Sequence, residues 1–217
     1  MAVPAPSVYQ RVLGDEFSRL DPRLQRYFGP LAPGEAGVGT GVYEEAGSRI
    51  RMLRPLLSVM ARRNVLFPEY GHGVPFTVVN SAAADGTLSA VRTFAFGERV
   101  RIMEDTMEVA GGALVDRLGK RRGLEVGIRL SVIDGGLRMR STRLALWIGR
   151  LRLPLPRLAV MHLDERMDPA GAARQCVDVR ITAPLLGEVF RYAGAFTYER
   201  RPSAFTGSPR PPRPGQE

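Results

Sequence analysis

Two long runs of alternating apolar and polar residues meet at Asp134-Gly135, and this dipeptide constrains the fold more than any other feature of the sequence. Asp-Gly suits the two-residue turn of a β-hairpin, in which both positions need a positive φ. Pairing across the turn sets Val132 opposite Leu137 and Leu130 opposite Met139, so one face is apolar. The sequence therefore predicts an antiparallel sheet.

The opposite face of this hairpin is basic. Arg129 is predicted to lie opposite Arg140, with Arg138 beside them. Like charges that face one another on a sheet repel unless solvent, an acid or an anion separates them. Glu125 is the acid in reach, and a solvated outer face is the favoured interpretation.

The same alternation predicts a β-rich chain up to residue 198. Expected strands are 38–44, 74–80, 88–96, 99–109 and 124–133, with later strands after Gly136, Leu158, Gln175 and Glu188. The phase of the alternation changes near Gly149, which predicts a bulge or a strand exchange there. Prolines at 154 and 156 predict that this segment is an edge or crossover strand, because proline cannot donate to a sheet.

Two helical regions accompany the strands. Ser7 and Gln10 form a capping-box pattern, and Asp21-Pro22 divides the segment that follows into two short amphipathic helices. A third helix is predicted over 49–63, with apolar residues on one side and Arg49, Arg51, Arg54, Arg62 and Arg63 largely on the other. Such a helix either packs on the sheet or lies on an anionic membrane, and packing is the favoured interpretation.

These patterns predict an α+β fold that is mainly β. We expect a strongly curved antiparallel sheet or an incomplete barrel of about eight or nine strands, with two or three amphipathic helices. Residues 1–199 are predicted to form a single globular domain. Residues 200–217 are rich in proline and arginine, which predicts a disordered tail.

The net positive charge of the chain is high, but it does not identify a class of binding partner. The net charge is +9 with a pI near 10.7, yet Lys120 is the sole lysine, which indicates a compositional preference for arginine. Basic and aromatic residues do not alternate as they do in proteins that bind single-stranded nucleic acids, so nucleic acid is not the expected partner. The amino terminus lacks a signal-peptide pattern and Cys176 is the sole cysteine, and both features predict a cytoplasmic protein.

The strongest candidate for a binding surface is the hairpin across Gly97-Glu98. Pairing there sets Phe96 against Arg99, Phe94 against Arg101 and Arg92 against Met103, with Asp105 diagonal to Arg92. A wet cavity that holds an apolar body and an anionic head would have this mixture of aromatic and charged residues. An outer face on which arginines cover aromatic rings would have it too, and this outer face is the favoured interpretation.

Other polar residues lie within apolar strand patterns. Asp116, Glu165 and Tyr192 are candidates to line a cavity, and His72 lies between two glycines, where its ring would be accessible for proton transfer. No metal site is predicted, since the two histidines lack ligand spacing, and no cofactor is predicted. The glycines at 34, 37, 39 and 41 are followed by Val42-Tyr43 of a predicted strand and not by the start of a helix, which excludes a nucleotide loop.

Several segments, taken in order, carry a resemblance to a known family. They are 24–29, 66–69, 73–75, 92–96, 114–119, 153–156, Glu165, 184–187 and 192–194. Together they resemble a bacterial family known as a domain of unknown function. The resemblance implies a domain over most of residues 8–198 and no catalytic residues to transfer. Members of that family occur alone or fused to short-chain or saccharopine-dehydrogenase-like domains or to transporter-like proteins, which implies a dehydrogenase-like protein as a partner in trans.

The sequence leaves three functional hypotheses. The first is a domain without catalysis that binds a small, partly apolar or anionic ligand through Arg92, Asp105, Asp116, Glu165, Tyr192 and His72. The second is an enzyme, or an accessory domain of a dehydrogenase-like system. The third is a module for an anionic membrane surface or a protein, which uses the basic residues of 49–63 together with Arg129, Arg138 and Arg140.

Overall fold

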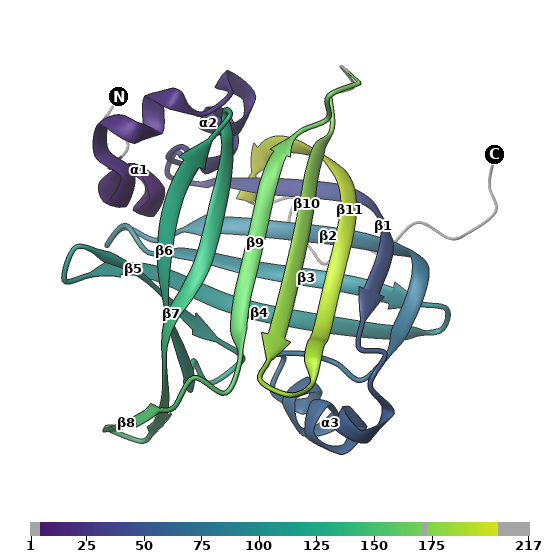
Figure 1. The fold of residues 1–217 in the computed structure, drawn as a ribbon. Helices are drawn as coiled ribbons and strands as arrows, with labels where there is room; N and C mark the ends of the chain where they lie inside the picture. Colours follow the sequence, from purple (N-terminus) through teal and green to yellow (C-terminus); the bar gives the residue numbers. More distant parts are fainter. Residues whose placement is uncertain (1–4, 171–172, 204–217) are drawn as a thin grey trace.

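The computed structural model describes residues 5–170 and 173–203, which form a closed antiparallel β-barrel (Figure 1). Ten strands of these residues form a closed ring, in which β6 pairs with β7 and the first strand, β1, pairs with the last, β11. The eleventh strand, β8, lies outside this ring. The strands are β1 (Glu35–Gly47), β2 (Tyr70–Ala82), β3 (Leu88–Phe96), β4 (Arg99–Ala110), β5 (Ala113–Leu118), β6 (Leu124–Ile133), β7 (Gly136–Ile148), β8 (Leu151–Leu155), β9 (Val160–Met167), β10 (Gln175–Ala183) and β11 (Gly187–Pro202).

The predicted hairpins have the registers that the sequence indicates. Across Asp134-Gly135, Val132 pairs with Leu137 and Arg129 pairs with Arg140. Across the predicted turn at Gly97-Glu98, Arg92 pairs with Met103. Local turn chemistry and alternation therefore define the pairing of neighbouring strands.

The closure of the sheet corrects the expectation of an incomplete barrel with eight or nine strands. β1 is much longer than the predicted strand 38–44, and it pairs with β2 on one side and with β11 on the other, along its whole length. β5 adds a strand to those expected, around the strand pattern that contains Asp116, and glycines with positive φ at 111, 112 and 119 flank it. β11 continues through Pro202, past the expected domain boundary, and residues 204–217 of the predicted tail lie outside the described residues.

The glycine-rich part of β1 makes room for aromatic rings inside the barrel. A Cβ at Gly37 would lie 1.6 Å from the Tyr198 hydroxyl oxygen, and a Cβ at Gly39 would lie 2.9 Å from the Phe196 ring. Side chains of β11 thus occupy the space that β1 leaves free. This explains why a segment whose composition is typical of a loop forms a strand.

Helical segments close the two ends of the barrel (Figure 1). At one end lie α1 (Val8–Leu13), the 3₁₀ helix η1 (Gly14–Arg19) and α2 (Pro22–Phe28), and they include the predicted capping box at Ser7 and the cap at Asp21. At the other end lie the short η2 (Arg51–Leu53) and α3 (Arg54–Arg62), which begins with Pro55 in its first turn.

α3 is only partly packed on the sheet. Leu57 is buried, and Leu53 and Met60 pack against the core, but Met52 and Leu56 are exposed. The predicted packing of this helix on the sheet therefore holds for Leu53, Leu57 and Met60 but does not extend to Met52 and Leu56.

The change of phase at Gly149 has a simpler cause than a bulge or a strand exchange. Gly149, with a φ of 61°, lies in the tight turn between β7 and β8, which pairs Ile148 with Leu151. β8 follows as an edge strand, as its prolines predict.

We predict that Gly37→Ala destabilises the protein by about 1–3 kcal/mol, because the added methyl group displaces the Tyr198 ring from a packed interior. Urea unfolding measures the change. Gly123→Ala is the matched control, since its Cβ would have its nearest contact at 3.7 Å. Equal stability of the two variants would show that the Tyr198 ring does not need the space that a Cβ at position 37 would occupy.

Candidate functional site

Five of the six predicted ligand-binding residues lie inside the barrel. They come from five strands: Arg92 from β3, Asp105 from β4, Asp116 from β5, Glu165 from β9 and Tyr192 from β11. The three acids and Tyr192 are buried. Alternation along each strand aims these side chains inward, so the inward-facing interpretation of the Arg92 hairpin holds and the outer-face one does not.

The central contact is an ion pair between Arg92 and Asp105. An Nη of Arg92 donates to Oδ1 of Asp105, whose side chain is 2% exposed. The second carboxylate oxygen of Asp105, Oδ2, is buried and has no hydrogen-bond partner among the described residues. A buried charged oxygen without a partner is costly, so Oδ2 is an acceptor available to a ligand.

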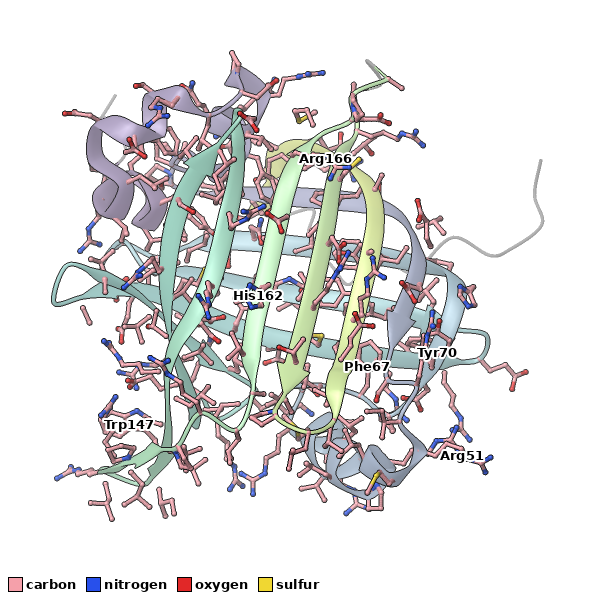
Figure 2. All side chains as sticks on the ribbon, viewed as in Figure 1. Arg51, Phe67, Tyr70, Trp147, His162 and Arg166 are labelled. Atoms are coloured by element: carbon pink, nitrogen blue, oxygen red, sulfur yellow. The ribbon has the colours of Figure 1, made fainter. Side chains whose placement is uncertain are left out.

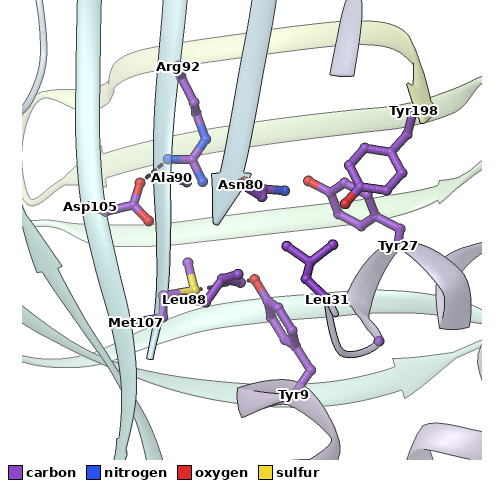
Figure 3. Close-up of a pocket in the computed structure, with 11 residues that line it drawn as sticks. Tyr9, Tyr27, Leu31, Asn80, Leu88, Ala90, Arg92, Asp105, Met107 and Tyr198 are labelled. Atoms are coloured by element: carbon purple, nitrogen blue, oxygen red, sulfur yellow. Dashed lines mark hydrogen bonds and ion pairs between the residues drawn. The ribbon is translucent and has the colours of Figure 1, made fainter. Parts of the chain in front are cut away.

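Arg92 and Asp105 line an interior cavity of about 20 Å³ (Figure 3). This volume suits about one water molecule. Figure 3 shows Tyr9, Tyr27, Leu31 and Tyr198 on the side of the cavity that faces the amino-terminal helices. The remaining lining residues come mainly from β2, β3 and β4: Asn80, Leu88, Ala90 and Met107, together with Gly29.

Two buried acids near this cavity hold their protons more tightly than ordinary acids. Burial raises the pKa of Glu165 to about 8, although Gln175 donates a hydrogen bond to it and Arg92 attracts its charge. Burial and the charge of Asp105 raise the pKa of Asp116, against the opposing effect of Arg92 and Arg122. The interior thus contains one ion pair and two acids whose pKa values are raised, which shifts both toward the neutral form.

The tyrosine hydroxyls of the interior remain protonated. Burial raises the pKa of Tyr192 to about 12, and burial also raises the pKa of Tyr9, Tyr27 and Tyr43. The Tyr9 hydroxyl donates to Sδ of Met107 at 3.2 Å. These groups offer hydrogen bonds without adding charge.

A larger outer groove of about 460 Å³ adjoins the interior cavity. The groove is lined by residues 5–8, by the segment 29–34, and by residues 82–84 and 86–88 around the β2–β3 turn, mostly with alanine, proline and leucine. Gly29, Leu31 and Leu88 line both spaces. Leu31 and Leu88 therefore lie between the groove and the buried Asp105.

The structure separates His72 from the interior. It is exposed on β2, where one ring nitrogen lies 3.2 Å from the Tyr70 hydroxyl and the other lies 3.0 Å from the Glu44 carbonyl oxygen. His72 consequently cannot act with Arg92 and Asp105 on one small molecule.

The predicted basic residues occupy two outer regions. Arg49, Arg51, Arg54, Arg62 and Arg63 lie on and around α3, whereas Arg129, Arg138 and Arg140 lie on the outer wall of β6 and β7. Arg138 pairs with Asp164 at 2.6 Å.

Glu125 is not the acid that separates Arg129 from Arg140. It instead accepts hydrogen bonds from Trp147 and Arg152. Figure 2 shows Trp147 near β8, toward the lower end of the barrel.

Several interior polar residues were not predicted. Asn80 follows Phe76 and Val78 on the inward face of β2, and Gln175 precedes Val177 on that of β10, so the alternation carried a signal for both. Tyr9 and Tyr27 gave no such signal, because an aromatic residue on an amphipathic helix is normally an ordinary core residue. Within the described residues, no group of three histidine, cysteine or acidic side chains is placed to hold a metal ion.

Comparison with known proteins identifies the family. The model of the family described as a domain of unknown function, DUF4166, matches residues 20–196. The chain belongs to this family. It is also similar to the uncharacterized protein YndH of Bacillus subtilis (strain 168), with 26% identity over 206 residues that cover 91% of this chain and 99% of that protein.

No solved structure matches the chain, so the barrel is described from this structure alone. In the described part of the chain, no helix has the length and apolar character needed to cross a bilayer.

We predict that Arg92→Met destabilises the protein by about 3–5 kcal/mol, because it leaves the Asp105 carboxylate buried without its cation. Combining it with Asp105→Leu should restore most of that loss, since an apolar pair of similar volume replaces a buried ion pair at little cost. Urea unfolding of both single variants and the double variant measures the coupling. If the double variant loses as much free energy of unfolding as the two single variants together, the two side chains do not stabilise each other.

We predict that Glu165→Gln weakens the pH dependence of stability between pH 5.5 and 7.5. In the folded protein Glu165 retains its proton up to about pH 8, whereas the unfolded chain releases it near its ordinary pKa. Stability is therefore lost as pH rises through this window, by up to about 1.4 kcal/mol per pH unit from this group. Urea unfolding at several pH values checks the slope.

Glu16→Gln, on the exposed surface of η1, is the matched control and should keep the wild-type slope. If Glu165→Gln keeps the wild-type slope, Glu165 does not retain its proton in the folded protein over this pH range, and the prediction is wrong.

Proposed function

We propose that the barrel binds a small, partly apolar molecule whose polar head reaches Asp105. The observation that carries this proposal is the buried Oδ2 of Asp105, which lacks a hydrogen-bond partner among the described residues and lines a cavity. A ligand that donates a hydrogen bond to this oxygen would satisfy it.

The outer groove is suited to the apolar body of such a ligand. Its volume of about 460 Å³ lies within the range of small-molecule sites, whereas the interior cavity takes about one water molecule. A ligand that occupies both spaces displaces Leu31 or Leu88, which separate them. The amino-terminal segment, which carries Tyr9, Tyr27 and Leu31, then acts as a movable cover.

The charges of the interior favour a neutral or cationic head over the anionic head that the sequence suggested. Arg92 is already paired with Asp105, so an anion would have to replace this carboxylate as its partner. Burial raises the pKa of both Asp116 and Glu165, so these neighbours supply no positive charge that would hold an anion. A hydroxyl, amide or amine is the head group that fits Oδ2 of Asp105.

A proton-transfer enzyme is the second candidate, and the pKa of about 8 for Glu165 favours it, because general acids and bases work best near neutral pH. Glu165 does not, however, line the interior cavity, and one of its oxygens already accepts a hydrogen bond from Gln175. Binding therefore remains the better-supported function.

Two fluorescent probes with one skeleton test the proposal. N-phenyl-1-naphthylamine is neutral and has an N–H donor, and 8-anilinonaphthalene-1-sulfonate adds an anionic group to it. We expect the neutral probe to bind at least about tenfold more tightly, which corresponds to one unfavourable charge contact of ~1.4 kcal/mol. Fluorescence titration measures both affinities, and a preference for the sulfonate would instead favour an anionic ligand.

A variant that fills the passage locates the site. Leu31→Trp should weaken binding of the neutral probe at least about tenfold, because the larger ring blocks the space between groove and cavity. Val42→Trp, on the exposed outer wall, is the control and should bind as wild type does. Equal binding by both variants would place the probe outside the groove.

A further inference from the structure

One end of the barrel carries most of the strongly exposed apolar side chains. Among the described residues, every large apolar side chain that is more than half exposed lies there except Val42, which lies on the wall in β1. They are Met52, Leu56 and Val59 around α3, Ile148 and Leu151 at the β7–β8 turn, Leu158 after β8, and Leu185 in the β10–β11 turn. We call this surface the apolar end.

The segments that carry these side chains lie together. Figure 1 shows α3, β8 and the turn between β10 and β11 at the lower end of the barrel. Backbone hydrogen bonds join α3 to β7 through the loop between β5 and β6. The Lys120 amide of this loop donates to the Arg63 carbonyl after α3, and the Trp147 amide of β7 donates to the Gly123 carbonyl of the loop. The apolar end is therefore one surface whose segments are joined by backbone hydrogen bonds.

The β7–β8 hairpin adds an aliphatic face to this surface. Ile148 pairs with Leu151, Leu146 with Leu153 and Leu144 with Leu155, so six aliphatic side chains share one side of two strands. Leu144 packs against the barrel core, whereas Ile148 and Leu151 at the tip are exposed. Exposed edge strands with an aliphatic face are otherwise a risk for aggregation, which indicates that a partner covers this one.

Arginines surround the apolar side chains. The two segments that contribute most to this end, residues 46–68 and 135–163, contain no aspartate or glutamate. No carboxylate of the described residues lies within ion-pair distance of the following arginines of this end: Arg51, Arg54, Arg62, Arg63, Arg150 and Arg157. Glu188, which follows the β10–β11 turn, is the exposed acid nearest in sequence to Leu185.

We propose that the apolar end docks on the surface of an anionic lipid bilayer. Leucine, isoleucine and methionine side chains would enter the region between headgroups and acyl chains, and the arginines around them would contact lipid phosphates. The apolar side chains project from separate segments, and a fluid bilayer can receive each of them without the complementary shape that a protein partner needs. The long arginine side chains can reach the headgroups while their stems stay in apolar contact.

This inference does not depend on the proposed ligand. The outer groove is lined by the amino-terminal segment and the β2–β3 turn, and none of its lining residues belongs to α3, β8 or the β10–β11 turn. A docked barrel would therefore leave the groove free.

Vesicle flotation of the whole chain tests the proposal. We expect binding to vesicles of phosphatidylcholine mixed with phosphatidylglycerol, and much weaker binding to phosphatidylcholine alone. Arg51→Glu combined with Arg54→Glu should reduce the binding about twentyfold or more, from roughly fivefold per arginine lost at the surface. Arg129→Glu combined with Arg140→Glu makes the same charge change on the wall and should have little effect. Equal loss in both pairs would overturn the proposal in favour of non-specific attraction.

A second pair of variants tests the apolar contacts. Leu56→Asp and Leu151→Asp should each reduce binding at least about tenfold, and Val42→Asp, an equally exposed site on the wall, should not. Sedimentation velocity in the absence of lipid gives the competing result. A dimer of the chain that Leu56→Asp dissociates would overturn the proposal and assign the apolar end to a second copy, as would the absence of binding to the anionic vesicles at low salt.

Discussion

The pairing of β1 with β11 is the constraint on which the rest of the structure depends. It joins the first strand to the last along registers from Glu35–Pro202 to Gly47–Arg191, and it turns an open sheet into a barrel. A closed barrel has no free edges among its own strands, but every inward side chain must then find its place in a confined interior. The inward glycines of β1 and the aromatic rings of β11 satisfy this requirement together, since neither set would fit without the other.

The closed interior explains where the polar residues lie. One apolar cluster, which includes Leu57 of α3, fills the barrel toward that helix, and a second, which includes Leu24 of α2, fills it toward the amino-terminal helices. Asp105 stands in β4 between Met103 of the first cluster and Met107 of the second. The polar groups thus occupy the boundary between the two apolar clusters. The outer groove adjoins the interior cavity at this boundary.

Local rules were sufficient for neighbouring strands and insufficient for closure. Turn dipeptides and alternation predicted the register of Arg92 with Met103, and even the diagonal position of Asp105, because these depend on residues close in sequence. The same rules could not decide whether Phe94 and Arg92 faced in or out, since a local pattern does not show on which side a sheet curves. The predicted strand 38–44 left out Gly37 because its partner, Tyr198, is distant in sequence. Likewise, the exposure of Leu56 depends on how much sheet lies beneath α3, which helical periodicity does not contain.

The buried polar cluster costs stability that the fold does not need. A buried ion pair contributes little compared with apolar residues of the same volume, and a carboxylate oxygen without a partner adds a further cost. Glu165 and Asp116 avoid part of this cost by favouring their neutral forms, as their raised pKa values indicate. An apolar interior would hold the same barrel together at least as well. The polar residues are therefore better explained by what they can bind than by what they stabilise, and this makes the interior, rather than the exposed His72, the first place to look for the function of the family.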